Sequence, residues 1–283
     1  MNERYDLHCH SSASDGALSP TELLDRAHRQ GVTRLALTDH DTTAGLAEAQ
    51  TAANAVGITL IPGIELSVTW ENYCFHIVGL NLNPQYPPLL EGCRKIQDIR
   101  RERAEKIAYK LDKQRIPGAL EAVKQAVGAG MVTRTHFADF LLAHHHVSTP
   151  QEAFDRYLGQ GKSAYVATNW VSLEDALEWI TGAGGIAVLA HPARYNLTAS
   201  KMRRFLSSFK ALGGQGLEVV YGRNNADDID SASHYARAFD LAGSVGSDFH
   251  NPKNQWVELG RLNPLPTRIM PVWQFFQNPA DSA

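Results

Sequence analysis

The sequence predicts an α/β fold in which about seven strands close into a barrel. Strand-like apolar runs alternate with helical segments in both halves of the chain, and polar side chains of metal-ligating type stand at the ends of several runs. Alternation of strand and helix indicates parallel strands, and right-handed crossovers allow such a sheet to close. In barrels of this kind the active residues gather at the carboxyl ends of the strands.

The first half contains four strand-like units. After the opening strand, Ser19, Pro20 and Glu22 form an N-cap, a first-turn proline and a capping box, so a helix is expected from there to about Gln30. A buried strand over 32–39 and a small-residue helix over 43–57 follow. The runs 58–66 and 73–82 are the next two strands.

A helical insertion is expected over 93–170. The proline-rich residues 84–88 interrupt the alternation, and apolar residues then recur at three- and four-residue spacing from Ile96 to Leu111. Shorter helical pieces are expected around 119–128, 134–146 and 150–158. We expect this insertion to cap the active end of the barrel.

The alternation returns in the second half. Ser172 caps a helix over 172–185, and strands over 185–192, 216–222 and 244–250 alternate with helices over 200–212 and 229–243. The barrel is therefore expected to consist of residues 1–92 and 171–263. Residues 264–283 would be a C-terminal arm that packs on the surface or contacts a second copy.

Composition excludes some classes of protein. A net charge of -3 is unlike that of a non-specific nucleic-acid binder. The three cysteines lack a CxxC spacing, which argues against a disulfide framework. No signal-peptide pattern and no apolar run of about 20 residues is evident. We expect a soluble cytoplasmic protein without a membrane contact or a stable protein partner.

Histidines and carboxylates recur in or after the strand-like runs. Asp6, His8 and His10 stand at every second position of the first run, so all three side chains would share one face of a strand. The later runs carry His40, Glu65, His76, His191, Asp248 and His250. Imidazole nitrogen and carboxylate oxygen together suit Mn²⁺, Fe²⁺ or Zn²⁺. Two or three such ions can lower the pKa of a shared water and bind a phosphoryl group, so the pattern predicts a polymetal site.

These motifs resemble the polymerase and histidinol phosphatase (PHP) family. The resemblance covers nearly the whole chain except the insertion and the arm. It is carried by His8-Cys9-His10-Ser11, Asp15, Thr38-Asp39-His40-Asp41, Gly63-Ile64-Glu65, His76, His191-Pro192 and Ser247-Asp248-Phe249-His250. It implies a distorted (β/α)₇ barrel around two or three metal ions. By the same resemblance, one metal is bound by His8, His10, Glu65 and Asp248, a second by Asp15, His40 and His250, and a third by His76 and His191 with Glu65 bridging.

The insertion narrows the resemblance. Together with TDHD and GIELS, its Arg134-Thr135-His136-Phe137 is similar to a subgroup that acts on nucleotides. The implied activity removes the 5′-phosphate of nucleoside 3′,5′-bisphosphates (pAp to 3′-AMP plus phosphate) by attack of a metal-bridging hydroxide, with Mn²⁺ as the first expectation. The alternatives are a 5′→3′ exoribonuclease acting on short RNA and a histidinol-phosphate phosphatase. The complete ligand set counts against a non-catalytic scaffold.

Several further residues are candidates for substrate contact or catalysis. The second phosphate of a bisphosphate substrate needs fixed positive charges, and Arg194 and Arg134 are suited to bind it. His136 would either donate a hydrogen bond to a phosphate or pack within the helical insertion. Tyr221, Arg223 and Asn225 follow a strand without a metal ligand, where they would contact base or ribose or simply form a turn. Arg194 would also stabilise the transition state, and His191, Asp15 or a metal-bound water would protonate the leaving group.

The run from Arg94 to Arg115 contains nine basic and four acidic residues. Such a run fits either an RNA-tracking patch or the solvated face of a helix with i,i+4 pairs such as Glu102–Lys106. We favour the solvated face.

Overall fold

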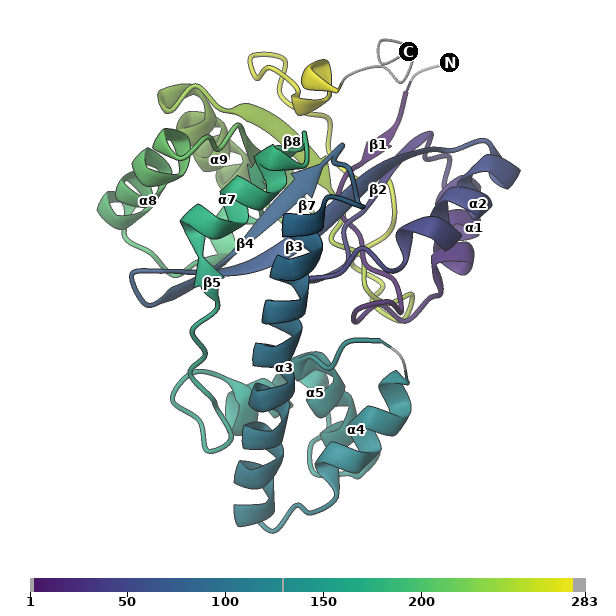
Figure 1. Cartoon of the computed structure of the whole chain (residues 1–283), viewed down its shortest axis with the longest axis vertical. Helices are drawn as coiled ribbons and strands as arrows, with labels where there is room; N and C mark the ends of the chain where they lie inside the picture. The colour runs from purple at the N-terminus through teal and green to yellow at the C-terminus, as the bar shows by residue number, and fades with distance from the viewer. Residues whose placement is uncertain (1–2, 129, 277–283) are drawn as a thin grey trace.

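A sheet of seven strands forms the body of the protein (Figure 1). The computed structural model describes residues 3–128 and 130–276. Neighbouring strands follow the order β1 (Tyr5–Asp6), β2 (Arg34–Leu37), β3 (Thr59–Trp70), β4 (Tyr73–Leu80), β6 (Ile186–Leu189), β7 (Gly216–Tyr221) and β8 (Ala242–Gly246). A short strand, β5 (Val171–Ser172), pairs with β3 outside this path.

The two edges of the sheet meet and nearly close it into a barrel. The amide of Leu7, just after β1, donates to the carbonyl oxygen of Val245 in β8 at 2.9 Å. The amide of Asp248 donates to the carbonyl of His8 at 2.7 Å, and Cys9 pairs with Phe249. The α/β barrel expected from the sequence is therefore confirmed.

One strand departs from the expected parallel arrangement. β4 runs antiparallel to both β3 and β6, so the expectation of an all-parallel sheet is wrong there. Only Glu71 and Asn72 connect β3 to β4, and both have positive φ (45° and 68°). A two-residue connection with left-handed backbone makes a hairpin, whereas a parallel crossover needs a dozen residues or more.

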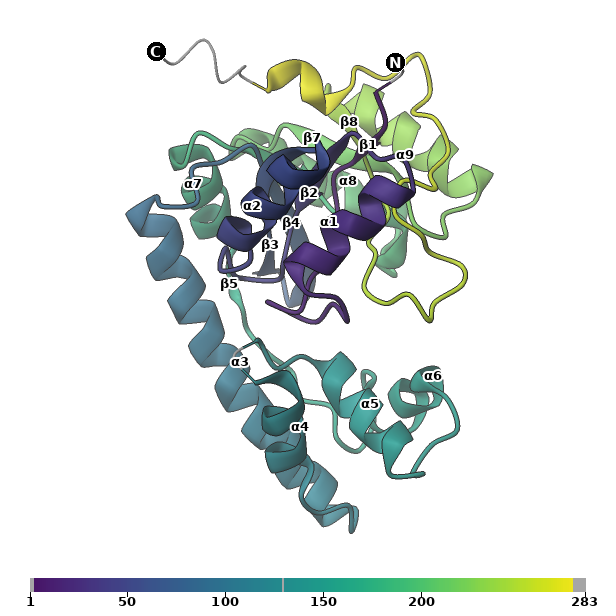
Figure 2. The same cartoon turned by 90° about the vertical axis from the view of Figure 1, so that its right-hand side faces the viewer.

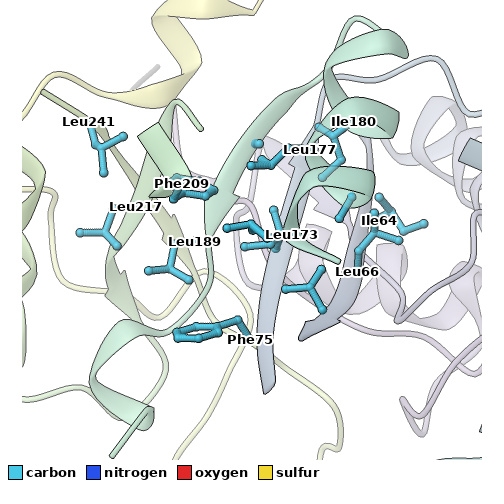
Figure 3. Close-up of a cluster of buried hydrophobic side chains, with 14 of the residues drawn as sticks. Ile64, Leu66, Phe75, Leu173, Leu177, Ile180, Leu189, Phe209, Leu217 and Leu241 are labelled. Atoms are coloured by element: carbon cyan, nitrogen blue, oxygen red, sulfur yellow. The ribbon is translucent and has the colours of Figure 1, made fainter. Parts of the chain in front are cut away.

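Helices cover the outside of the barrel. They are α1 (Pro20–Arg29), α2 (Leu46–Val56), α7 (Leu173–Gly182), α8 (Ala199–Ala211) and α9 (Ala226–Ala238). The predicted caps of Ser19 and Ser172 are present, since their hydroxyls accept from the amides of Glu22 and Asp175. Figure 3 shows the largest apolar cluster, in which Leu189 and Leu217 from the strands meet Leu177 and Phe209 from the helices.

A smaller cluster includes side chains from most of the strands. It contains Leu7, Ala36, Ile61, Val188 and Ala242, all buried. The described part of the predicted C-terminal arm, residues 264–276, joins this cluster through Val272. It ends in η3 (Val272–Phe275), and the ring of Trp273 stacks on Tyr5 at 4.2 Å between centroids. Residues 277–283 of the arm lie outside the described residues.

The predicted insertion has a hydrophobic core of its own. Its long first helix, α3 (Pro87–Lys113), starts on the barrel and extends away from it (Figure 2). α4 (Ala119–Val127) packs on the far half of α3, and α5 (Arg134–Ala143), α6 (Pro150–Ala153) and η1 (Phe154–Leu158) join them in one apolar cluster. The first residues of α3, including Leu89 and Ile96, belong to the core of the barrel instead. The proposed domain boundary at 93 therefore falls inside one continuous helix.

Gly92 fixes the position of α3 on the barrel. A Cβ atom there would lie 2.4 Å from two ring carbons of Trp179 in α7. We expect Gly92→Ala to lower the free energy of unfolding by about 1–3 kcal/mol, because overpacking outweighs the gain in helix propensity. Urea denaturation measures the change, with Glu91→Ala on the exposed side of the same turn as the matched control. Equal stability of the two variants would contradict this account of how α3 packs.

Candidate metal centre

Nine histidines and carboxylates converge at one end of the barrel. They come from the segment after β1, the connection after β2, the interiors of β3 and β4, and the segments after β6 and β8. All nine are the residues that the sequence singles out as ligands: His8, His10, Asp15, His40, Glu65, His76, His191, Asp248 and His250.

The carboxylate of Glu65 stands at the middle of this group. Its Oε2 lies 2.9 Å from Nδ1 of His40 and 3.3 Å from the Nε2 atoms of His8 and His10. Its Oε1 lies 3.0 Å from Nδ1 of His76 and 3.2 Å from Nε2 of His191. Five imidazoles thus surround one buried carboxylate, with the two oxygens facing different subsets.

Two aspartates face the same imidazoles from either side. Oδ1 of Asp248 lies 3.4 Å from Nε2 of His8 and 3.2 Å from Nε2 of His10. Oδ1 of Asp15 lies 3.4 Å from Nε2 of His250 and 4.0 Å from Nδ1 of His10.

Donor atoms within 4.8 Å of one another form three overlapping groups: His10, Asp15, His40 and His250; His8, His10 and Glu65; and His40, Glu65 and His76. These overlap with the three sets implied by the resemblance. They differ in that His10 and His40 each belong to two groups, and in that neither His191 nor Asp248 belongs to any of the three. The division of ligands among ions stays a prediction.

The donor atoms of the cluster fit metal ions. Among the described residues, six of them are buried without a hydrogen-bond partner: His10 Nδ1, Asp15 Oδ1, His40 Nδ1, Glu65 Oε2, His76 Nδ1 and His191 Nδ1. Buried polar atoms are normally satisfied, because an unmade hydrogen bond there costs about 1–3 kcal/mol. Bound cations would satisfy the lone pairs that converge on this point.

The charges of the cluster shift its pKa values strongly. Burial lowers the pKa of His10, but Asp248 and Glu65 outweigh it and raise the pKa to about 9. Against the same burial, Glu65 raises the pKa of His76 to about 10. Burial lowers the pKa of His40 to about 4. Protons therefore compete with metal ions for His10 and His76 at neutral pH.

Buried carboxylates behind the ligands orient them. Glu218, in the middle of β7, accepts from Nδ1 of His8 and from the amide of His191, both at 2.6 Å. Asp39 accepts from the hydroxyls of Ser11 and Ser14, each at 2.6 Å. The ligand motifs of the sequence do not include Glu218, although an acid inside the apolar run GLEVVYG was a usable signal.

Asp6 does not join the cluster, so the expectation that it projects with His8 and His10 is wrong. Its carboxylate accepts from the amides of Ser247 and Gly260, both at 2.8 Å. β1 ends at Asp6, so the two-residue alternation does not continue to the histidines.

The backbone is strained at three positions of the site. Asp41, His191 and Asp248 have φ values of 54°, 30° and 54°. Non-glycine residues adopt such conformations at a cost of order 1–3 kcal/mol, and they persist where the surroundings fix them. For His191 and Asp248, this backbone aims a ligand side chain into the cluster.

A cavity of about 330 Å³ lies between the ligand cluster and the insertion. Its insertion side is lined by Arg100, Arg103, Arg134, Phe154, Tyr165 and Trp170. Arg100 is committed to Asp41 and Ser67. In the described parts of the chain, no ion pair involves Arg103 or Arg134, and Nε of Arg103 is buried without a partner.

The basic run on α3 is therefore not wholly a solvated face, which corrects that interpretation in part. Arg94, Arg101 and Lys106 are exposed and form i,i+3 or i,i+4 pairs. Arg100 and Arg103 instead point inward and flank Trp170, at 4.9 and 5.2 Å from its ring centroid. Arg100 stands four residues after Ile96, on the buried stripe of the helix, and that spacing was the signal available in the sequence.

The other predicted contact residues take different places. Arg194 pairs with Asp248 and lines the cavity, whereas His136 does not line it. Nδ1 of His136 accepts from the amide of Thr133 at 3.0 Å in a capping box, and Asn225 caps α9. The hydroxyl of Tyr221 accepts from the amide of Ala193 at 3.2 Å. The geometry thus gives His136 and Asn225 local roles, and their contact with substrate stays a prediction.

The barrel and its ligand cluster define the class to which this protein belongs. A PHP domain model matches residues 6–159. The chain belongs to the PHP-domain family, so the resemblance found in the sequence is confirmed. No helix within the described ranges is long and apolar enough to span a lipid bilayer.

Curated relatives match along nearly the whole chain. A 5′-3′ exoribonuclease of Haemophilus influenzae is 48% identical, over 98% of this chain and 100% of that protein. A 3′,5′-nucleoside bisphosphate phosphatase of Chromobacterium violaceum is 43% identical over 95% of each. A solved structure from Chromobacterium violaceum, described as an amidohydrolase with bound sulfate and no metal, has a TM-score of 0.92. It is 42% identical and covers 96% of this chain and 95% of its own.

Glu218→Gln tests how the ligands are held. The amide cannot carry the negative charge that fixes the tautomer of His8, so we expect metal affinity to fall by about 10–100-fold. Metal titration of the variant measures the change, and Glu178→Gln on the exposed side of α7 is the matched control. A wild-type affinity in Glu218→Gln would show that His8 is oriented by other contacts.

Proposed function

We propose that this chain is a metal-dependent phosphomonoesterase that removes the 5′-phosphate of nucleoside 3′,5′-bisphosphates. The observation that carries the proposal is a cavity with two different sites for a phosphate. The metal-ligand cluster forms one wall, and on the insertion side stand Arg103 and Arg134, which form no ion pair with any described residue. The bisphosphate phosphatase from Chromobacterium violaceum, similar over 95% of its length, supports the same substrate class.

Arg103 and Arg134 are the groups we assign to the 3′-phosphate. Burial, together with the neighbouring Arg134 and Arg100, lowers the pKa of Arg103 to about 9. Burial likewise lowers the pKa of Arg134. Two partly desolvated guanidinium groups side by side are stabilised by a dianion between them, and their planar donors match phosphate oxygens.

The cofactors we propose are two or three divalent cations, with Mn²⁺ favoured over Zn²⁺ or Fe²⁺. The nine ligands of the cluster supply nitrogen and oxygen donors only, and several borderline ions accept that donor set. When bound, such ions activate a water for in-line attack and neutralise the charge on the transferred phosphoryl group.

The side chains of the protein itself position the phosphoryl group and protonate the leaving oxygen. Arg194 pairs with Asp248 through Nη1, donates from Nη2 to the carbonyl of Gly222 at 3.3 Å and borders the cavity, so its remaining N–H groups are the ones we assign to an equatorial phosphoryl oxygen. Asp15 and His191 both line the cavity, and we retain them as candidates for delivering the proton that the departing 5′-oxygen needs. Phe154 and Tyr165 line the insertion side, where a nucleobase would pack.

Tyr221 and Asn225 are retained as weaker candidates for contact with base or ribose. His136 is retained as a hydrogen-bond donor to a substrate phosphate. Cytoplasmic placement is part of the proposal, since Cys9, Cys74 and Cys93 are all free thiols.

A 5′→3′ exoribonuclease is the second candidate, because the relative from Haemophilus influenzae carries that name over its full length. A histidinol-phosphate phosphatase is disfavoured by charge. Its substrate carries an ammonium group, which the arginines on the insertion side would repel.

The 3′-phosphate site is tested by removing one arginine. We expect Arg103→Ala or Arg134→Ala to lower kcat/KM for pAp by roughly 10–150-fold, because hydrogen bonds to a charged group contribute about 1.5–3 kcal/mol. Release of phosphate from 5′-AMP, which lacks the 3′-phosphate, should change little.

Arg101→Ala is the matched control, since Arg101 is exposed two residues before Arg103 on α3. If Arg103→Ala lowered kcat/KM equally for pAp and for 5′-AMP, the assignment of Arg103 to the 3′-phosphate would be contradicted. Failure of the Mn²⁺-loaded wild type to release phosphate from pAp, while it hydrolyses histidinol phosphate, would contradict the proposed function itself.

A further inference from the structure

A second hollow adjoins the ligand cluster, and the sequence motifs do not account for it. It has a volume of about 580 Å³ and shares Thr135, Arg194, Asp248 and His250 with the cavity described above. Its other walls include Tyr221, Arg223, Asn251 and Asn254. It does not include Arg103 or Arg134, so the cluster stands between two hollows of different character.

This hollow continues along the barrel. A third one, of about 460 Å³, shares Tyr221, Gly222, Arg223 and Val257 with it. The segment after β8, yellow-green in Figure 2, forms much of its wall. We call the second and third hollows together the side channel.

The far part of the side channel displays a large aromatic residue to solvent. Trp256 is 80% exposed, more than any other large hydrophobic residue among those described. Its backbone is held, since its amide donates to Oδ1 of Asn254 at 3.2 Å. An indole on a held backbone at the edge of a polar channel, left largely exposed by the described residues, is typical of a stacking platform for bases.

The same part of the channel is basic. Arg4, Arg223 and Arg261 line it, and its one acidic wall residue, Glu258, is already bound by Arg26 through two hydrogen bonds of 2.9 and 2.6 Å. Within the described ranges, neither Arg223 nor Arg261 belongs to an ion pair. Exposed, unpaired guanidinium groups beside an aromatic ring suit the phosphates and bases of a single strand.

Hydrolysis of a phosphodiester at the ligand cluster would require such a channel. The phosphorus of a phosphodiester carries two ester oxygens, each with its own organic group, whereas that of a monoester carries one. When the first linkage of a 5′-phosphorylated strand is hydrolysed, the oxygen of water bonds to phosphorus and the bond from phosphorus to the 3′-oxygen breaks. The 3′-oxygen takes a proton, and the strand keeps the new 5′-phosphate.

The two halves of such a diester match the two hollows. The departing nucleotide carries a second phosphate on its far hydroxyl, just as the departing nucleoside of pAp does, so it fits the side with Arg103 and Arg134. The remaining strand, attached through its 5′-oxygen, must leave the ligand cluster in another direction.

We infer that the side channel binds the 3′ continuation of a 5′-phosphorylated single-stranded RNA whose first phosphodiester lies at the ligand cluster. Trp256 stacks on a base, and Arg223 and Arg261 bind backbone phosphates. The inference rests on the proposed phosphoesterase function of the cluster, and it adds a place on the protein for the strand that the second candidate function requires.

Two assays on the full-length, Mn²⁺-loaded protein test the inference separately from the proposed function. Phosphate release from pAp, which is too short to enter the side channel, reports on the proposed function. Binding of 5′-phosphorylated oligoribonucleotides of two to six residues, measured by fluorescence anisotropy with a phosphorothioate at the first linkage to slow hydrolysis, reports on the channel.

In the wild type, affinity should rise with strand length until the strand reaches Trp256. Trp256→Ala should weaken binding of the longer strands by roughly 5–150-fold, the effect of losing one stacked base. It should leave the dinucleotide and the kinetics of pAp unchanged. Arg261→Ala should reduce the dependence of log affinity on log salt by about 0.7, as expected for the loss of one phosphate contact.

Tyr109→Ala is the matched control, because Tyr109 is 60% exposed on α3 and lies outside the channel. The inference is overturned if Trp256→Ala binds the hexanucleotide as tightly as the wild type, or if Tyr109→Ala weakens binding equally. If the wild type released no phosphate from pAp but still bound oligonucleotides with an affinity that rises with length, the proposed function would be overturned. The assignment of the side channel as a strand-binding surface would not be.

Discussion

The burial of Glu65 among five imidazoles is the constraint on which the rest of the structure depends. An ionised carboxylate taken out of water is costly unless it is paired, and here the pairing is shared with Asp15 and Asp248. In the metal-free chain protons on His10 and His76 supply part of the balancing charge. Divalent cations would supply the rest, and they would also satisfy the buried nitrogen and oxygen atoms that make no hydrogen bond among the described residues.

The barrel makes this concentration of charge possible by supporting it from behind. Glu218 fixes His8 and the backbone of His191, and left-handed backbone aims His191 and Asp248 inward. The hairpin of β3 and β4 brings His76 to the cluster from an antiparallel strand, which a regular crossover could not do. Two strands and the segments that follow four others carry the ligands, whereas α3 and α5 of the insertion carry the arginines that face them across the cavity.

The sequence predicted the cluster better than its surroundings. The ligands were visible because imidazole and carboxylate groups in or beside apolar strands have few structural uses, and the fold brought all of them together. The direction of β4 was missed because the pattern of an isolated strand does not encode its partner; only the two-residue link at Glu71 hinted at a hairpin. Arg103 was hidden within a basic run, since a periodic sequence does not show which side of a long helix meets a second domain. Asp6 was misplaced because strand alternation was extended past the end of β1.

The central claim is that this cluster is a metal centre. Calorimetric titration of Mn²⁺ into the metal-free protein at pH 7, in two buffers of different ionisation enthalpy, tests it most directly. Because the raised pKa values of His10 (about 9) and His76 (about 10) keep both imidazoles protonated below those values, binding must release protons. The account predicts at least two ions per chain with net proton release. Fewer than one ion per chain, or binding without proton release, would contradict it.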